Sequence, residues 1–227
     1  MSLLKLDLHV HTIYSGDSII SPKNLIKYAK IKGLDGFAIT DHDTLKAYAI
    51  LKKQNLRNEL VIIPGMEIKT HIGEITALFI EENVEFKNNH FLTVVETVKE
   101  NNGLIIIPHP FDFLRDNSLK IKYLNDEIIK KYINGIEILN SRIIFKRCIK
   151  KAIVFNQKYN LFETGGSDAH LKEEIGNGYT LIQNTDKTHE NIRKSLNNNK
   201  SKSMGALSNP IVHAITVFNK IKKRLYV

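Results

Sequence analysis

The chain has 227 residues, of which 42% are hydrophobic and 25% are charged, a composition typical of one soluble globular domain. Its formal net charge is +9, and most of this lies after residue 186, where nine Lys or Arg accompany one acidic residue. No apolar run approaches the roughly 18 residues that a membrane span needs, and Lys5 and Asp7 interrupt the apolar start of the chain, so we expect no secretory signal. The single cysteine, Cys148, cannot form an internal disulfide. These features predict a cytoplasmic protein with no membrane partner.

Short apolar runs typical of buried strands alternate with helical patterns along the chain. We expect strands at residues 4–10, 36–40, 60–63, 74–79, 104–108, 135–139, 161–165 and 179–182. The clearest helix begins after the N-cap Ser21, has Pro22 at its first position and stops at Gly33. Further helices are expected at residues 44–54, 92–101, 143–155, 187–198 and 210–225, with a polar linker at 197–202. This alternation predicts an α/β fold and favours a closed barrel over an open sheet.

Imidazoles and carboxylates gather at the C-terminal ends of the predicted strands. His9 and His11 follow the first strand with one residue between them, so both side chains lie on the same face. Similar groups follow later strands, at Asp41-His42-Asp43, Glu67, His109 and Asp168-Ala169-His170. In a (β/α) barrel these ends converge on one face. The mixture of nitrogen and oxygen donors suits Zn, Mn or Fe, and the donors are too many for one ion.

Five motifs carry a family resemblance. They are His9-Val10-His11-Thr12, Thr40-Asp41-His42-Asp43, Pro64-Gly65-Met66-Glu67, Pro108-His109-Pro110 and Gly166-Ser167-Asp168-Ala169-His170. In this order they resemble the motifs of the PHP (polymerase and histidinol phosphatase) domain family, in its small stand-alone phosphoesterase form. The resemblance implies a distorted (β/α)₇ barrel as a single domain over residues 1–185. A basic helical segment at 186–227 would then pack on the barrel or extend from it.

The resemblance also implies a cluster of two or three divalent metal ions (Zn, Mn or Fe). Its ligands would be His9, His11, Asp17, His42, Glu67, Glu74, His109, Asp168 and His170. The first ion would take the two histidines of the first motif, with Glu67 and Asp168 completing or bridging the cluster. Asp17, His42 and His170 would hold the second, and His109 the third with Glu67. Many relatives supply another histidine at the position of Glu74, which here would be an oxygen ligand, with His71 as a second candidate.

Two or three such ions can activate water as a metal-bound hydroxide and clamp the oxygens of a phosphate ester. Arg142 is the candidate cation for the charge that develops on the transferred group, and an ion pair or a solvent-exposed position is the alternative for it. Lys69, Arg115 and Lys172 are other candidates for this role. Asp41 and Asp43 flank His42, and one of them would either orient that imidazole or protonate the leaving oxygen, with Asp43 the candidate for a catalytic role.

The leading hypothesis is a phosphomonoesterase acting on a phosphorylated small molecule or nucleotide. A 5′–3′ exonuclease on short nucleic acids is the second choice, because the basic C-terminal tail is suited to a nucleic-acid end, although a solvated surface also explains the tail. A histidinol-phosphate phosphatase is a further alternative, although nothing in the sequence marks a histidinol site. The non-enzymatic alternative is a catalytically silent metal-binding module, which the retention of the ligands disfavours.

Overall fold

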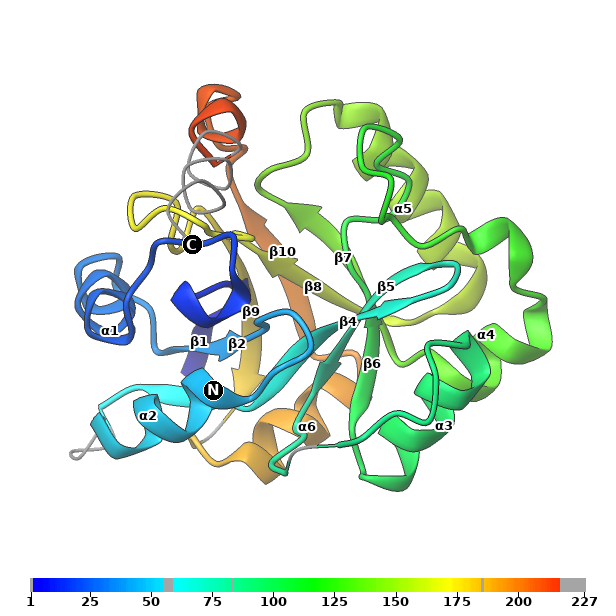
Figure 1. Cartoon of the computed structure of the whole chain (residues 1–227), viewed down its shortest axis with the longest axis horizontal. Helices are drawn as coiled ribbons and strands as arrows, with labels where there is room; N and C mark the ends of the chain where they lie inside the picture. Colours follow the sequence, from blue (N-terminus) through cyan, green and yellow to red (C-terminus); the bar gives the residue numbers. More distant parts are fainter. Residues whose placement is uncertain (1, 55–58, 83, 185, 217–227) are drawn as a thin grey trace.

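A computed structural model of the chain describes residues 2–54, 59–82, 84–184 and 186–216. Its strands form two five-stranded sheets, with the orders β10-β9-β1-β2-β3 and β4-β5-β6-β7-β8 (Figure 1). The first sheet consists of β1 (Ser2–Val10), β2 (Gly36–Ile39), β3 (Val61–Ile63), β9 (Gly178–Asn184) and β10 (Ser201–Gly205). The second consists of β4 (Gly65–Thr70), β5 (Gly73–Leu78), β6 (Leu104–Ile107), β7 (Gly135–Asn140) and β8 (Phe162–Gly166). The helices are α1 (Pro22–Ile31), α2 (Lys46–Gln54), α3 (Phe91–Glu100), α4 (Asp126–Tyr132), α5 (Lys146–Tyr159) and α6 (His189–Asn197), with short 3₁₀ helices η1 (Ile13–Ser15) and η2 (Ile121–Tyr123).

The α/β class is as predicted, but the closed (β/α)₇ barrel is wrong. No strand was predicted between residues 63 and 74, whereas Gly65–Thr70 forms β4 and pairs with β5 in an antiparallel hairpin. β5 is also antiparallel to β6, and β9 and β10 are antiparallel to each other. β4 and β5 are joined by a tight turn with no crossover helix between them, whereas a (β/α) barrel needs parallel strands joined by crossover helices. The chain passes from one sheet to the other at Pro64, which has no N–H to continue a ladder.

The two sheets meet at the C-terminal ends of their parallel strands. Isolated bridges join Val10 to Ala169 and His42 to Glu67, outside the regular ladders. The motifs of both sheets therefore lie next to each other at this edge although the barrel is not closed.

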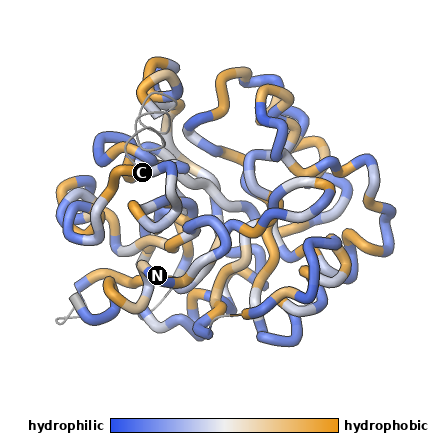
Figure 2. Tube along the Cα trace, viewed as in Figure 1, coloured by the Kyte–Doolittle hydropathy of each residue, from blue (hydrophilic) through white to orange (hydrophobic). Residues whose placement is uncertain are grey.

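The buried strands and the apolar helix faces form the core. All four residues of β2 and all four of β6 are buried. In α3 the buried residues Phe91, Val94, Val95 and Val98 follow helical spacing and pack into the core of the second sheet. Figure 2 shows polar residues along many outer turns and apolar residues in the interior strands. The core thus fixes the strand ends from which the candidate site is built.

The segment after β9 adds to the first sheet. α6 is followed by β10, which pairs with β9 from Ser201 opposite Ile182 to Gly205 opposite Gly178 and begins inside the polar linker predicted at 197–202. Residues 211–216 are helical, at the start of the helix predicted for 210–225, and the rest of that prediction lies outside the described residues. No helix in the described ranges has the length and apolar character needed to cross a bilayer.

Candidate metal centre

Backbone hydrogen bonds hold the predicted motifs against one another. Asp168 N donates to His9 O at 2.7 Å, and His11 N donates to Ala169 O at 3.1 Å, which ties the end of β1 to the segment after β8. Asp43 N donates to Glu67 O at 3.1 Å, which ties the segment after β2 to β4. The side chains of residues far apart in sequence are thereby brought to one place.

The buried part of the site consists of His9, His109, Glu67 and Glu74, which we call the deep cluster. The Nε2 atom of His109 lies 2.9 Å from Glu67 Oε1 and 3.8 Å from Glu74 Oε2. His9 Nε2 lies 3.5 Å from the same Glu67 oxygen. None of these four side chains is more than 6% exposed. Glu67 is therefore shared by donors from both sheets.

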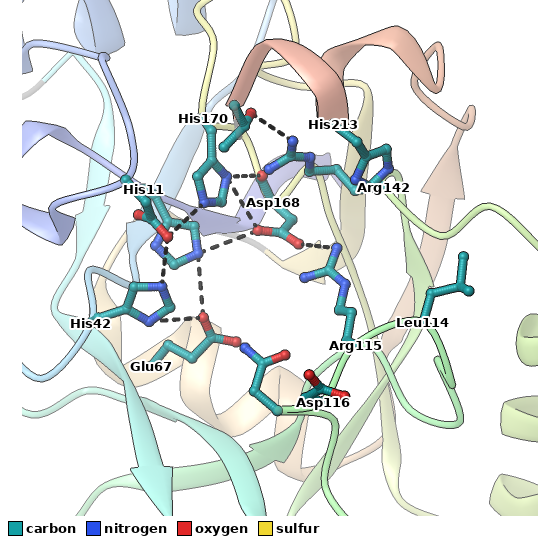
Figure 3. A pocket seen from close by; sticks show the side chains of 13 residues that line it. His11, His42, Glu67, Leu114, Arg115, Asp116, Arg142, Asp168, His170 and His213 are labelled. Carbon is teal, nitrogen blue, oxygen red and sulfur yellow. Dashed lines mark hydrogen bonds and ion pairs between the residues drawn. The ribbon is translucent and has the colours of Figure 1, made fainter. Parts of the chain in front are cut away.

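The other part consists of Asp17, His42 and His170, which we call the mouth cluster (Figure 3 labels its two histidines). Asp17 Oδ2 lies 3.2 Å from His42 Nε2 and 3.4 Å from His170 Nε2. His42 Nδ1 lies 3.3 Å from Glu67 Oε2, so the two clusters meet at that carboxylate. The side chain of His42 is 28% exposed, which makes this part of the site accessible.

His11 and Asp168 lie between the two clusters. His11 Nε2 is 3.2 Å from His9 Nε2, 3.4 Å from Glu67 Oε2 and 3.3 Å from Asp168 Oδ1. The structure thus brings all nine predicted ligand residues together, since each has a donor atom within 3.8 Å of another. Asp168 and His109 both have positive φ, 54° and 29°, a backbone strain of the kind found at functional sites.

Opposing effects of burial and charge set the pKa values of the imidazoles. Burial lowers the pKa of His9, but the carboxylates of Glu137 and Glu67 together raise it well above its ordinary value. The pKa of His11 falls to about 3, because burial and the charge of His170 both disfavour its protonated form. A neutral His11 can offer its lone pair to a cation.

The pKa values of the carboxylates also depend on burial and on neighbouring charges. Burial raises the pKa of Glu67, but attraction to His9 and a hydrogen bond with His109 bring it well below its ordinary value. Burial and the negative charge of Glu67 raise the pKa of Glu74 to about 7. A cation bound between Glu67 and Glu74 would offset the repulsion that helps to raise the pKa of Glu74.

The donor atoms fit divalent cations. Three groups have donor atoms within 4.8 Å of one another: His11, Asp17, His42 and His170; His9, His11 and Glu67; and His42, Glu67 and Glu74. Within the described part of the chain, Asp17 Oδ1 is buried and has no hydrogen-bond partner, as expected for a free ligand oxygen. Imidazole nitrogen with carboxylate oxygen is the donor set of Zn, Mn and Fe.

Sequence reasoning missed the groups that orient these donors. Glu137 Oε1 lies 3.1 Å from His9 Nδ1, and its Oε2 accepts from the backbone N of His109 at 2.7 Å. A glutamate within the apolar run of β7 was the signal that could have found it. Asn117 Nδ2 donates to Glu74 Oε2, and Ser15 Oγ lies 3.0 Å from His11 Nδ1. Ligating imidazoles commonly have such partners on the second ring nitrogen.

The two arginines near the site have different surroundings. Arg115 Nη2 lies 2.7 Å from Asp168 Oδ2, and its Nε donates to Asp112 Oδ2 at 3.1 Å. Arg142 Nε lies 3.2 Å from Glu174 Oε1, and its Nη2 donates to Thr216 Oγ1 at 2.8 Å. Both arginines line the pocket of the site.

The other residues considered for a catalytic role are Asp41, Asp43, Lys69 and Lys172. Asp43 Oδ1 accepts from the backbone N of Lys69 at 3.3 Å, while both ring nitrogens of His42 face other carboxylates, so neither Asp43 nor Asp41 orients that imidazole. Asp41 instead accepts hydrogen bonds from the backbone and hydroxyl of Thr12. Lys172 Nζ lies 3.8 Å from Glu173 Oε1. Among the described residues, neither Lys69 nor Lys172 lines the pocket.

A cavity of about 530 Å³ opens beside the mouth cluster. Figure 3 labels ten of its lining side chains, which come from β4, from loops that follow strands of both sheets and from the helical residues 211–216: His11, His42, Glu67, Leu114, Arg115, Asp116, Arg142, Asp168, His170 and His213. His9, His109 and Glu74 lie behind this lining rather than on it. The arrangement can hold cations at the base of the cavity and admit an anionic group from the open side.

Comparisons with known proteins agree with this geometry. The PHP domain family model matches residues 7–200. An uncharacterized protein of Methanocaldococcus jannaschii is 37% identical over 177 residues, which cover 78% of this chain and 69% of that protein. A protein of Caldicellulosiruptor bescii named a probable phosphatase is 26% identical over 208 residues, which cover 76% of this chain and 82% of that protein.

A solved structure shares the fold. It is a two-domain protein of Bacteroides vulgatus described as containing a predicted PHP-like metal-dependent phosphoesterase, with a TM-score of 0.77 and 20% identity. The match covers 90% of this chain and 65% of that one, so this chain spans less than two thirds of that protein. With the family model matching most of the sequence, including the motifs that converge at the site, the chain belongs to the PHP domain family.

Proposed function

We propose that this protein is a metal-dependent phosphoesterase that hydrolyses phosphate monoesters of a small or nucleotide-like alcohol. The observation that carries the proposal is the gathering of imidazole and carboxylate donors at the base of one cavity that also presents Arg115 and Arg142. Donors alone would suit a structural metal site. Two guanidinium groups beside them suit an anionic substrate, because guanidinium matches the oxygens of phosphate.

In this proposal the donors hold two or three divalent cations. His9, His11, Glu67 and Asp168 would hold one and Asp17, His42 and His170 a second, with Glu67 shared. His109 would hold a third with Glu67 and Glu74. Bound divalent cations supply Lewis acidity, which neutralises phosphate oxygens and lowers the pKa of water toward about 7.

The protein's own groups position the ester. Arg115 reaches Asp168 at 2.7 Å and so places a fixed positive charge beside the donors, where it would stabilise charge on the transferred phosphoryl group. Arg142 is the second candidate for this role. Asp43 N and Oδ1 hold β4 against the segment that carries His42, so we assign Asp43 the positioning of that segment.

The test is hydrolysis of p-nitrophenyl phosphate by the purified protein with Mn²⁺ or Zn²⁺, beside bis(p-nitrophenyl) phosphate and a 5′-labelled oligonucleotide. We expect turnover of the monoester, loss of turnover in His9→Ala and unchanged turnover in His90→Ala, which replaces an exposed histidine. Faster cleavage of the oligonucleotide would favour the nuclease. Full metal occupancy without hydrolysis across a broad panel of phosphate esters would favour the silent binding module.

A further inference from the structure

The helical residues 211–216 lie beyond the part of the chain that the family model matches, yet they form one wall of the cavity. His213 and Thr216 line it together with Asp168 and His170. In Figure 3 the His213 imidazole lies beside Arg142, above the donors. The outline of the cavity on this side therefore depends on a segment outside the family match.

Hydrogen bonds from a buried arginine hold residues 211–216 in place. Arg142, only 5% exposed, donates from Nη2 to Thr216 Oγ1 at 2.8 Å and to Val212 O at 3.3 Å. Its Nε faces Glu174, whose Oε2 accepts from the backbone N of His170 at 3.1 Å. The helix is thus connected through two buried charged side chains to the loop of a candidate metal ligand.

The chain before the helix is also attached near the site. Ser208 N donates to Ser141 O at 2.6 Å, and Asn177 Nδ2 donates to Ser208 Oγ at 3.1 Å. Ala206 N donates to Asn177 O at 2.8 Å. These contacts place the wall in a defined position beside the cavity.

The lining of the cavity is polar. Among the described residues that line it, none is Phe or Tyr, and Leu114 is the only one with a purely aliphatic side chain. Nucleobases are commonly bound by stacking on large aromatic side chains, and for stacking the described lining offers only imidazole and guanidinium groups. Imidazole, amide and guanidinium groups instead match an alcohol that carries several hydroxyls.

Of the two wall residues, His213 has hydrogen-bonding capacity to spare. The Thr216 hydroxyl accepts from Arg142 and donates to Val212 O at 2.9 Å. The His213 imidazole lies near the backbone of Arg142, and because an imidazole has two ring nitrogens, at least one is available to a ligand.

We propose that residues 211–216 are a specificity wall, on which His213 forms a hydrogen bond with a hydroxyl of the alcohol part of the substrate. The substrate class is then a small polyhydroxylated phosphomonoester, such as a sugar phosphate, rather than a nucleotide. This inference rests on the proposed function and names the substrate class of that site. Arg142 is in this arrangement a positioning residue for the wall.

The experiment compares kcat/KM for glucose 6-phosphate, AMP and p-nitrophenyl phosphate in the full-length protein loaded with Mn²⁺. We expect the wild type to prefer the sugar phosphate. His213→Ala should lower kcat/KM for the sugar phosphate by about 10- to 100-fold, because it removes a hydrogen bond made only with the hydroxyl. For p-nitrophenyl phosphate the change should stay within about threefold, and His213→Asn should restore part of the loss. Ile211→Ala, on the same helix but 61% exposed, is the matched control and should behave as the wild type.

An equal loss on all three esters in His213→Ala would overturn the proposal, because it would indicate a general structural role. A wild-type preference for AMP that His213→Ala leaves unchanged would also overturn it. If the wild type hydrolysed none of the esters, the proposed function would fail, and calorimetry would still test the wall. His213→Ala should then weaken binding of glucose 6-phosphate but not of inorganic phosphate, and equal binding of both by the variant and wild type would overturn the wall.

Discussion

The deep cluster and the mouth cluster use the same kinds of donor atom but are held in different ways. The deep donors lie on strands or directly after them, and two of them are held by neighbouring side chains: Glu137 contacts His9, and Asn117 contacts Glu74. The mouth donors lie on loops, and Asp17 keeps one buried oxygen without a partner among the described residues. The deep cluster is thus built for fixed geometry, whereas the mouth cluster is built for access from the cavity. Substitutions in the two clusters should therefore differ in size and in how far added metal restores activity.

The largest effect is expected for His9→Ala. His9 Nε2 lies within 3.5 Å of both His11 Nε2 and Glu67 Oε1, so the substitution removes a proposed metal ligand next to the buried Glu67 carboxylate. We expect kcat/KM to fall by about a thousandfold or more, with the loss of bound metal measured by elemental analysis. Circular dichroism should show an intact fold, and His90→Ala is the control. Activity within tenfold of the wild type would remove His9 from the centre.

A smaller effect is expected for Asp17→Asn in the mouth cluster. The change removes the charge that faces His42 and His170, but it leaves the deep donors in place. We expect a loss of about 100-fold in kcat/KM at limiting metal, much of it recovered by excess Mn²⁺, because one weakened site can be refilled. Titration of activity against metal concentration measures this. A loss that excess metal does not recover would show that the two clusters are not separable.

Glu137→Gln tests the support of the deep cluster. The amide keeps the size of the side chain but removes the charge that faces His9 Nδ1 at 3.1 Å. We expect metal affinity to fall by about 10- to 100-fold, measured by competition with a chelating dye. Glu82→Gln, at an exposed position, is the matched control. An unchanged affinity would contradict the orienting role of Glu137.

The smallest effect is expected for Glu74→Gln, which tests the third ion. Glu74 Oε2 is 3.8 Å from His109 Nε2, and Asn117 already donates to the same oxygen. We expect loss of one metal equivalent at most and a decrease of about tenfold in kcat/KM. Elemental analysis of the wild type and the variant measures the number of bound metal ions in each. Equal metal content in the two would leave the centre without Glu74 as a ligand.

Residues with distinctive chemistry and local spacing were predictable from the sequence. The alternation of His9 and His11 predicts a shared face, and the order of motifs indicates the family that the family model independently matches. Ser21 and Pro22 predict the start of α1, where the structure has Ser21 as N-cap. Such features are local, because caps and strand alternation depend on residues a few positions apart.

Features that depend on the choice of strand partners and on contacts between distant residues were not predictable in this way. The hairpin of β4 and β5 and the pairing of β10 with β9 replace the closed barrel, because a strand's partner and direction are chosen by the packing of the whole sheet. In the sequence Glu137 is a single polar residue within an apolar strand, and only the fold places it beside His9. His213 could not be assigned, since its position depends on how Arg142 and Glu174 hold a helix against the cavity.

The sequence by itself determined the donor types, their order and most of the strands near them, because these follow from side-chain chemistry and local backbone preference; β4, which carries Glu67, was not predicted. Only the tertiary structure decided that two separate sheets, rather than one barrel, bring those ends together. It also decided which donors are buried, which face the cavity and which segment forms its wall. The physical reason is that burial and electrostatic environment arise from contacts between residues more than a hundred positions apart, such as His9 with Glu137.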